Sequence, residues 1–265
     1  MRFKSPVLLA LALTTLLVAG CPSGTDDDAD GGADGGGDGG SGPLCEELVR
    51  PPCEDTMFLE MNLQSTIAPG QIVTLADGEG GFDSHVDATA GGFMANPPDA
   101  YVYAKFTPNG LQKVELSDED ATLSHDWDIA FHRFVIRINS GASGASCVTA
   151  AGLPTSVLYA DVTEVPTGLT FVEDDFYDES CNFIDDGSGL GTSPLTALSG
   201  FYAYTSCVSM TGQIFIVQLR DGSHVKLEVE SYYEPTKQEQ CDTLQTAPTP
   251  PTGSGNIRMH WAFLP

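Results

Sequence analysis

Hydrophobic and polar residues alternate in short runs along this chain, which is the pattern of half-buried β-strands. The longest apolar run after the amino terminus spans residues 124–141 and is rich in aromatic and β-branched residues. It ends at Asn139-Ser140-Gly141, which predicts a strand that enters a turn. An extended backbone would place Trp127 and Phe131 on one face and His132 on the other.

Other runs with this pattern bring the expected number of strands to about ten. They span residues 57–63, 71–76, 101–107, 112–116, 156–162, 201–206, 213–220, 224–233 and 256–263. Pro108-Asn109-Gly110 and Asp221-Gly222 are strong turn signals, so each predicts a hairpin. Ser117 followed by three acids predicts one helical turn. The remaining segments are rich in Gly, Asp and Pro and are expected to be loops: 77–100, 173–194 and 235–255.

The predicted fold class is therefore all-β. Hardly any helix is expected, and no repeat of fixed period is present. We predict a single antiparallel β-sheet domain of about ten or more strands with long loops, following a signal peptide and a disordered stalk. This domain would span residues 44–265, a length that fits one large β-domain.

The amino terminus has the composition of an export signal. Arg2 and Lys4 precede an apolar run, residues 7–18, which is shorter than the roughly 20 residues of a membrane-spanning helix. The run ends in Val18-Ala19-Gly20-Cys21, which resembles a bacterial lipobox. We expect a lipoprotein signal peptide over residues 1–20 and lipidation of Cys21, which anchors the mature chain to a membrane. The alternative is an ordinary secretory signal.

Residues 21–43 would be the lipidated cysteine and a stalk of Gly, Asp, Ser and Ala. Such a segment cannot bury enough apolar surface to offset its ordering entropy, so we expect disorder. A calcium-binding interpretation of its aspartates exists, but no EF-hand pattern with a closing Glu is present.

The formal net charge of the chain is −26. Without the two leader cations and the six stalk aspartates, about −22 remains on the globular part. This charge argues against nucleic-acid binding, because phosphate is neutralised by Lys and Arg. It also argues against electrostatic adhesion to anionic lipid, and it favours solubility.

Six cysteines remain once Cys21 is lipidated, and an even number in an exported chain predicts three disulfides. Cys45 and Cys53 are near enough in sequence to close a short loop around Pro51-Pro52. The other four would staple the longer loops: Cys147, Cys181, Cys207 and Cys241. A metal site is the competing use, but the sequence has no Cys-x-x-Cys and no Cys/His cluster.

No catalytic motif supports an enzyme. The chain has no phosphate-binding glycine loop, no Gly-x-Ser-x-Gly elbow and no His-Glu-x-x-His. The acid pairs Asp174-Asp175 and Asp185-Asp186 are typical of solvated loops. The side chains that could bind a ligand are the methionines and five histidines: His85, His125, His132, His224 and His260. An imidazole could ligate a metal or haem iron, and Met210 could be a soft axial ligand. A lone histidine on a strand is more often a hydrogen-bonded structural group.

Two motifs together resemble the HmuY family. The first is Asp126-Trp127-Asp128-Ile129-Ala130-Phe131-His132-Arg133, followed by Ile136-Arg137-x-Asn139-Ser140-Gly141-x-Ser143-Gly144. The second, weaker motif is Asp221-Gly222-x-x-Val225-Lys226-Leu227, which runs into Ser231-Tyr232-Tyr233. With the lipoprotein leader, the resemblance covers roughly residues 55–263.

The resemblance implies a largely antiparallel β lipoprotein that binds haem in a cleft between loops and passes it to a TonB-dependent outer-membrane receptor. It also implies two axial ligands in the segments after the first motif. This chain departs from that pattern, because it has no histidine between His132 and His224. The candidate haem-binding residues are His125, His132, Met210 and His224.

The same resemblance makes the first motif mainly a fold-defining strand. Trp127 and Phe131 would belong to the core. Arg133 and Arg137 would pair with Asp128 or with nearby acids.

We therefore expect a non-catalytic, HmuY-like lipoprotein in the bacterial cell envelope, with haem as its cofactor. Pro22-Ser23 after the lipidated cysteine, in place of Asp, favours the outer membrane. The alternative is a disulfide-stapled acidic β-domain that acts as a structural or adhesive surface module without haem. Convergence of two of His85, His125, His132, Met210 and His224 on one pocket would favour haem. A third interpretation, calcium binding by the acidic loops, predicts a melting temperature that rises with calcium.

Overall fold

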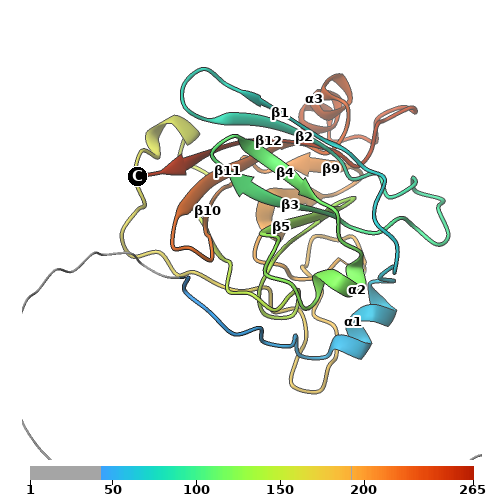
Figure 1. Ribbon diagram of the computed structural model, residues 1–265. Coiled ribbons are helices and arrows are strands. Elements are labelled where there is room, and N and C mark those ends of the chain that lie inside the picture. Colours follow the sequence, from blue (N-terminus) through green and yellow to red (C-terminus); the bar gives the residue numbers. More distant parts are fainter. Residues whose placement is uncertain (1–42, 192) are drawn as a thin grey trace, which may run out of the picture. The chain divides into compact units, whose positions relative to one another are not determined.

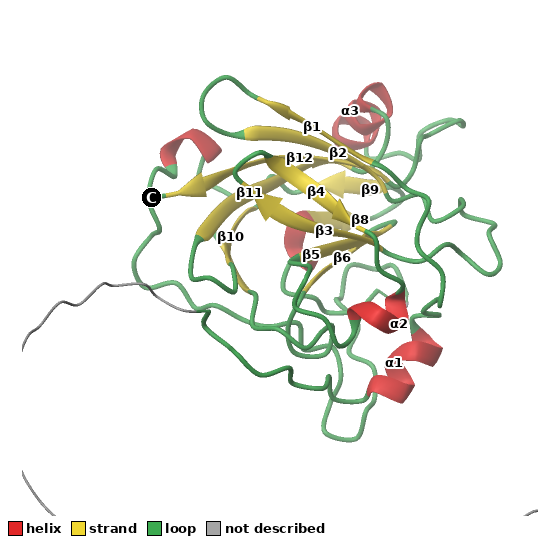
Figure 2. Cartoon of the chain, in the orientation of Figure 1, coloured by secondary structure: helices red, strands yellow, loops and turns green. Residues whose placement is uncertain are grey.

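The computed structural model describes residues 43–191 and 193–265 (Figure 1). The expected signal peptide, the lipidation site at Cys21 and all of the stalk except Pro43 lie outside these residues. Within the described part, strands and long connecting loops predominate and helices are few and short (Figure 2). The expectation of a mostly β fold is confirmed.

The largest sheet has six antiparallel strands. Their order is β1 (Ile72–Ala76), β2 (Phe82–Asp87), β12 (Asn256–Leu264), β11 (His224–Ser231), β10 (Ile214–Gln218) and β7 (Thr149–Gly152). Along β11, Val225, Leu227 and Val229 are buried, whereas Lys226 and Glu228 between them are partly exposed. This period of two gives the sheet one face toward the core.

A second sheet has four strands, in the order β4 (Gly110–Val114), β3 (Val102–Thr107), β5 (Ile129–His132) and β6 (Val135–Ile138). One face packs against the six-stranded sheet, where the Phe106 ring lies 4.9 Å from that of Trp261. The other face carries Tyr103 and Trp127 into a separate cluster. Because this sheet is buried on both faces, it forms a middle layer.

The single sheet predicted from the sequence is therefore divided among three sheets. The third is a two-stranded ribbon, β8 (Tyr202–Tyr204) paired with β9 (Val208–Met210). Alternation along the chain indicates strands, but it does not indicate which strands share a sheet, because pairing joins residues far apart in sequence. Both predicted hairpins are confirmed, as β3–β4 and as β10–β11.

In the described part of the chain, three α-helices lie outside the sheets: α1 (Glu54–Glu60), α2 (Asp118–Ala121) and α3 (Pro235–Leu244). The helical turn predicted after Ser117 is confirmed, and the Ser117 side chain accepts a hydrogen bond from the Asp120 N–H at 3.1 Å. The strand predicted over residues 57–63 is wrong, because α1 occupies its first part. Met57 and Met61 are four residues apart, so the same apolar spacing fits a helix face.

Three further expectations need correction. The loop predicted over 77–100 contains β2, and the loop predicted over 235–255 contains α3. The strand predicted over 156–162 holds a short 3-10 helix, η1 (Tyr159–Asp161); a second, η2, spans Ser199–Phe201. The segment around η1 covers apolar residues of β10, so its own apolar side chains pack from outside the sheet.

All six cysteines of the described residues form disulfides, as predicted. The pairs are Cys45–Cys147, Cys53–Cys181 and Cys207–Cys241. The prediction that Cys45 and Cys53 bond to each other and close a short loop is wrong. The backbone N–H of Leu44 bonds Arg220 O at 2.7 Å, and that of Val49 bonds Ala145 O at 3.1 Å. These bonds hold the segment along the domain, so each cysteine meets a distant partner.

Candidate functional site

The first motif was predicted as one strand that enters a turn at Asn139-Ser140-Gly141. It forms instead two strands, β5 and β6, which pair as a hairpin, and most of this hairpin is buried. Trp127 and Phe131 are fully buried, which confirms their expected place in the core. The prediction that they share a face is wrong, because Phe131 belongs to the main core cluster and Trp127 to the cluster that contains Tyr101.

His132 pairs with Val135, so Arg133 and Phe134 form the turn, and Arg133 has the left-handed φ of 52°. This tight turn carries His132 and Arg133 to the end of the hairpin, next to the surface.

Arg137 of β6 is a buried cation, with 1% of its surface exposed. The sequence suggested Asp128 or a nearby acid as its partner, and Asp128 is not that partner. Its Nη2 donates to the Tyr103 hydroxyl at 2.8 Å, and that hydroxyl donates to Asp118 Oδ1 at 2.8 Å. Its guanidinium also lies 4.0 Å from the centroid of the Tyr101 ring. The charge of Arg137 is thus balanced through a tyrosine, with aromatic rings around it.

Residues at the end of the first motif and Ala197 together surround the Asp174 carboxylate. The backbone N–H groups of Ile138 and Ala197 bond its carboxylate at 3.0 and 2.8 Å, and the Ser143 hydroxyl also donates to it. A side chain at Gly141 would collide with the Asp174 carbonyl. Burial raises the pKa of Asp174 to about 6. The expectation that Asp174 is a solvated loop acid is therefore wrong.

A pocket of about 440 Å³ opens beside the β5–β6 turn, and we call it the His132 pocket. Apolar and aromatic side chains predominate in it, and its volume lies in the range of small-molecule sites. It is lined by Glu60, Met61, Tyr101, His132, Arg133, Phe134, Val135, Phe183 and Pro194.

His132 supplies the imidazole of this pocket. Its ring centroid lies 4.7 Å from that of Tyr101, with an angle of 30° between the planes. Burial lowers the pKa of His132 to about 4, and the nearby charges of Arg137 and Arg133 act in the same direction. At neutral pH the imidazole is therefore uncharged, which is the form that coordinates metals.

Met61, Tyr101 and Glu60 bring further heteroatoms to the pocket, and sequence reasoning did not select any of them. Met61 directly follows α1, and it packs partly buried against the cluster that contains Trp127. Burial raises the pKa of Tyr101, so its phenol stays protonated. The four-residue spacing of Met57 and Met61 was the only sequence signal that could have placed Met61 on an inward helix face.

His125 lies in a different pocket. That pocket has a volume of about 290 Å³ and contains the charged residues Lys105, Asp128, Arg220 and Asp221. His125 Nε2 is 3.3 Å from Ala145 O. Asp128 accepts a hydrogen bond from the Phe106 N–H at 2.9 Å, and burial raises the pKa of Asp128 to about 6. This setting is polar, unlike that of His132.

His224 lies at the far end of β11 from the His132 pocket. Tyr232, just after β11, accepts a hydrogen bond from Arg133 Nη2 at 3.0 Å, which places that end near the pocket. At about 3.3 Å per strand residue, His224 is roughly 25 Å from Tyr232. Its ring instead lies 5.8 Å from that of Phe171 on the outer side of the sheet.

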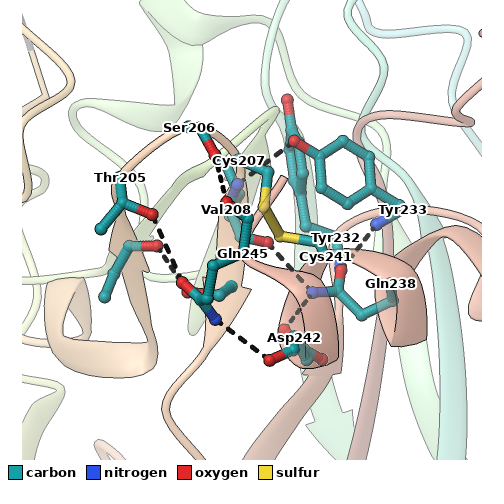
Figure 3. Close-up of a disulfide and its surroundings, with 12 residues drawn as sticks. Thr205, Ser206, Cys207, Val208, Tyr232, Tyr233, Gln238, Cys241, Asp242 and Gln245 are labelled. Atoms are coloured by element: carbon teal, nitrogen blue, oxygen red, sulfur yellow. Dashed lines mark hydrogen bonds between the residues drawn. A yellow bond between two sulfur atoms is a disulfide. The ribbon is translucent and has the colours of Figure 1, made fainter. Parts of the chain in front are cut away.

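Met210 belongs to β9, which is fixed to α3. Its N–H donates to Asp242 Oδ1 at 2.9 Å. Figure 3 shows the Cys207–Cys241 disulfide near Asp242, with Gln238 bridging the two segments. Gln238 accepts from the Tyr232 and Tyr233 N–H groups and donates to Val208 O, at 2.9, 3.1 and 3.0 Å.

The candidate histidines and Met210 do not converge on one of the pockets described, so the convergence that would have favoured haem is not found among them. Among the pockets described, His125 and His132 line separate ones, and neither pocket is lined by His224 or Met210. His85 bonds Asn256 Oδ1 at 3.0 Å, which is a structural contact. The larger groove of about 850 Å³ carries Glu47, Glu173 and Asp175 and has no histidine or methionine in its lining.

Within residues 43–191 and 193–265, no group of three or more His, Cys, Asp or Glu side chains could hold a metal ion. No helix in this part of the chain has the length and apolar character to cross a membrane.

Comparison with known proteins places the chain in a family. The solved structures similar to it include a candidate HmuY-like heme binding protein from Bacteroides vulgatus, with 14% identity, a TM-score of 0.43 and coverage of 72% of this chain and 95% of that one. An apo HmuY analog from Tannerella forsythia has 16% identity and a TM-score of 0.35, over 77% and 99%. A candidate lipoprotein from Bacteroides fragilis has 15% identity and a TM-score of 0.44, over 71% and 91%.

None of the curated proteins matches this chain. The family model described as HmuY protein matches residues 98–243, which is more than half of the sequence and includes both motifs. The chain therefore belongs to the HmuY family.

Proposed function

We propose that this protein is a non-catalytic, lipid-anchored haem-binding protein and that its haem lies in the His132 pocket. HmuY is a haem-binding family and not an enzyme family, which gives the proposal its ligand. The observation that carries it is the uncharged imidazole of His132 in an apolar, aromatic pocket.

The lining of the pocket suits a porphyrin. Phe134, Val135, Phe183 and Pro194 offer apolar contact to a flat macrocycle. Arg133, at the turn, offers a cation to the haem carboxylates. A local cation matters here, because the strongly acidic chain would otherwise repel an anionic ligand. Bound haem would supply an iron centre, for which the His132 imidazole is a donor.

Titration of the purified mature chain with haem tests this proposal. We expect a Soret shift that saturates at one haem per chain and an affinity at least about tenfold lower for His132→Ala. His224→Ala is the matched control, because His224 lies at the far end of β11. An absent Soret shift would overturn the proposal, and so would a His132→Ala affinity equal to that of the native chain.

The membrane anchor and the partner belong to the same proposal. Acylation at Cys21 would hold the protein on the outer membrane, and a TonB-dependent receptor would receive the haem. The lipobox-like Val18-Ala19-Gly20-Cys21 supports the anchor. Labelling cells with a fatty-acid analogue should mark the native protein and leave Cys21→Ser unlabelled. Equal labelling of both proteins would contradict the anchor at Cys21.

The alternative function, a structural or adhesive surface module without haem, predicts a domain that lacks an apolar, ligand-lined cleft. The His132 pocket favours haem over this alternative. A third interpretation, calcium binding by the acidic loops, predicts that calcium raises the melting temperature, and a melting curve unchanged by calcium would remove it.

A further inference from the structure

The larger groove, of about 850 Å³, shares no lining residue with the His132 pocket, and we call it the acidic groove. Its lining comes from four segments of the chain: 45–52, 141–147, 172–175 and 195–197. This lining contains four carboxylates and, among the described residues, no Lys, Arg or His. The groove is therefore negatively charged throughout.

Three of these carboxylates are available to a ligand. Glu47, Glu173 and Asp175 are exposed, whereas Asp174 is buried and already bonded. Among residues 43–191 and 193–265, no ion pair uses any of the three exposed acids. Their charges favour an occupant that carries cations.

The same groove exposes apolar side chains. Val49, Val172 and Leu195 come from three of its segments, and their exposed fractions are 66%, 47% and 41%. Apolar side chains that gather on one exposed surface mark an interaction site more often than scattered ones do. A hydrated ion would leave them in water, so the occupant that fits also has apolar groups.

The groove also offers backbone groups at the edge of a sheet. Val172 exchanges two hydrogen bonds of 2.9 Å with Ala150 of β7, the last strand of the six-stranded sheet. Successive residues of a ladder direct their backbone groups to opposite sides, so those of Glu173 point away from β7. Within the described residues, the N–H and C=O of Glu173 make no backbone hydrogen bond. They are placed to pair with an added extended segment.

The four segments are held together, so the groove is formed in advance. The Cys45–Cys147 disulfide joins the first segment to the second. Asp174 joins the other two, because its carbonyl accepts from the Ala142 N–H at 2.7 Å and its carboxylate from the Ala197 N–H at 2.8 Å. A rigid site loses little conformational entropy when a ligand binds.

We propose that the acidic groove is a docking site for an extended segment of a partner protein in which basic and apolar side chains alternate. The basic side chains would meet the three exposed carboxylates, the apolar ones would cover the exposed apolar residues, and the main chain would pair with Glu173. A polyamine would satisfy only the carboxylates. A second copy of this chain, with a net charge of −26, would bring acids against acids. The inference goes beyond the proposed function and does not depend on haem.

Fluorescence anisotropy with a labelled synthetic peptide tests the docking site. The probe is a fluorescein-labelled peptide in which Lys and Val alternate, added to the purified mature chain without haem. We expect saturable binding that weakens as the salt concentration rises. The same peptide with Glu in place of Lys should not bind. Absence of binding by the Lys–Val peptide would overturn the proposal.

Matched variants separate the groove from the general acidity of the surface. Glu47→Gln/Glu173→Gln should lower the affinity for the Lys–Val peptide about tenfold. Glu119→Gln/Glu239→Gln removes the same charge from exposed positions on α2 and α3 and should leave the affinity within about twofold of the native value. Equal losses in the two double variants would show non-specific attraction and overturn the site.

The apolar and backbone contacts have tests of their own. Leu195→Ser should lower the affinity about threefold or more, and Val73→Ser, at a 55% exposed position of β1, should not. A peptide N-methylated at alternate residues loses the N–H groups that would pair with Glu173 and should bind more weakly. Equal binding of the methylated and unmethylated peptides would overturn the strand pairing. Full displacement by spermine at equal charge would identify the site as one for small cations and overturn the partner segment.

Two controls complete the experiment. Circular dichroism and melting temperature should match the native protein in every variant, because the substituted side chains are exposed. Peptide binding should be the same before and after addition of haem. A chain that binds the peptide and no haem would overturn the proposed function and leave the docking site standing.

Discussion

The guanidinium carbon of Arg137 lies 4.0 Å from the centroid of the Tyr101 ring, and the His132 ring lies 4.7 Å from the same centroid. One tyrosine therefore contacts both a buried cation and the imidazole of the pocket. Arg137 and His132 are both residues of the first motif. The buried cation and the candidate ligand are thus connected through Tyr101. This residue lies outside the motif, directly before β3.

Removing the Arg137 charge should destabilise the domain strongly. In Arg137→Met the hydroxyl of Tyr103 loses its donor, and the buried Asp118 loses the cation that balances it. We expect a loss of about 3 kcal/mol in the free energy of unfolding, measured by urea denaturation. Arg50→Ala is the control, because the Arg50 side chain is 66% exposed and its pair with Glu54 should contribute less than about 1 kcal/mol. A loss below about 1 kcal/mol in Arg137→Met would contradict this role.

Stability should depend on the protonation of Asp174. Burial raises its folded-state pKa to about 6, above the unfolded value near 3.9, so the folded protein holds this proton more tightly than the unfolded chain. This contribution is complete below about pH 4 and is lost as the pH rises through 6; it is on the order of 3 kcal/mol. In Asp174→Asn, the urea midpoint should change less between pH 4 and pH 7 than it does in the native protein. The exposed neighbour variant Asp175→Asn should keep the native slope, and an unchanged slope in Asp174→Asn would refute the assignment.

Asn139, which directly follows β6, should be sensitive to substitution. It is completely buried, and its amide donates to Ser124 O and Trp127 O, both at 2.8 Å. Its carbonyl oxygen accepts from the Ser146 N–H at 3.2 Å. Asn139→Ala leaves these groups unpaired and should cost about 2–3 kcal/mol, measured by thermal and urea unfolding. Asn109→Ala in the β3–β4 turn is the exposed comparison, and similar losses in both variants would contradict the prediction.

Gln238 should couple α3 to the strands beside it. Gln238→Leu would leave the Tyr232 and Tyr233 N–H groups and the Val208 carbonyl without their partner (Figure 3). We expect a loss of about 2 kcal/mol in the free energy of unfolding and faster hydrogen exchange in β9. The neighbouring surface change Glu239→Gln should have little effect. Unchanged exchange in β9 of Gln238→Leu would argue against this bridge.

Local chemistry accounts for the parts of the fold that were predicted. Pro108-Asn109-Gly110 and Asp221-Gly222 set their hairpins within a few residues, so their turns could be read directly. Ser117 caps α2 in the same local way. The division into three sheets could not be predicted from the sequence, because it depends on which distant strands pair, such as β2 with β12.

The candidate site, too, could be predicted only in part. His132 was selected from the first motif, and its environment differs from that of His125 although the two are only seven residues apart. Met61 was missed, because its segment fits both a strand and a helix by spacing. Met61 and His132 line the same pocket, and the disulfide near Met61 joins Cys53 to Cys181, which are 128 residues apart.

The Cys45–Cys147 bond gives the domain a mechanical property. A force applied to the amino-terminal end of the described chain acts on Cys45 after only two residues. The disulfide transmits it to Cys147, which lies just before β7 in the sequence. These cysteines are 102 positions apart in the sequence. The chain between them, which includes β1 to β6, forms a covalently closed loop that the force cannot extend. Tension from a membrane anchor would therefore load the six-stranded sheet through β7 and leave the His132 hairpin unstretched.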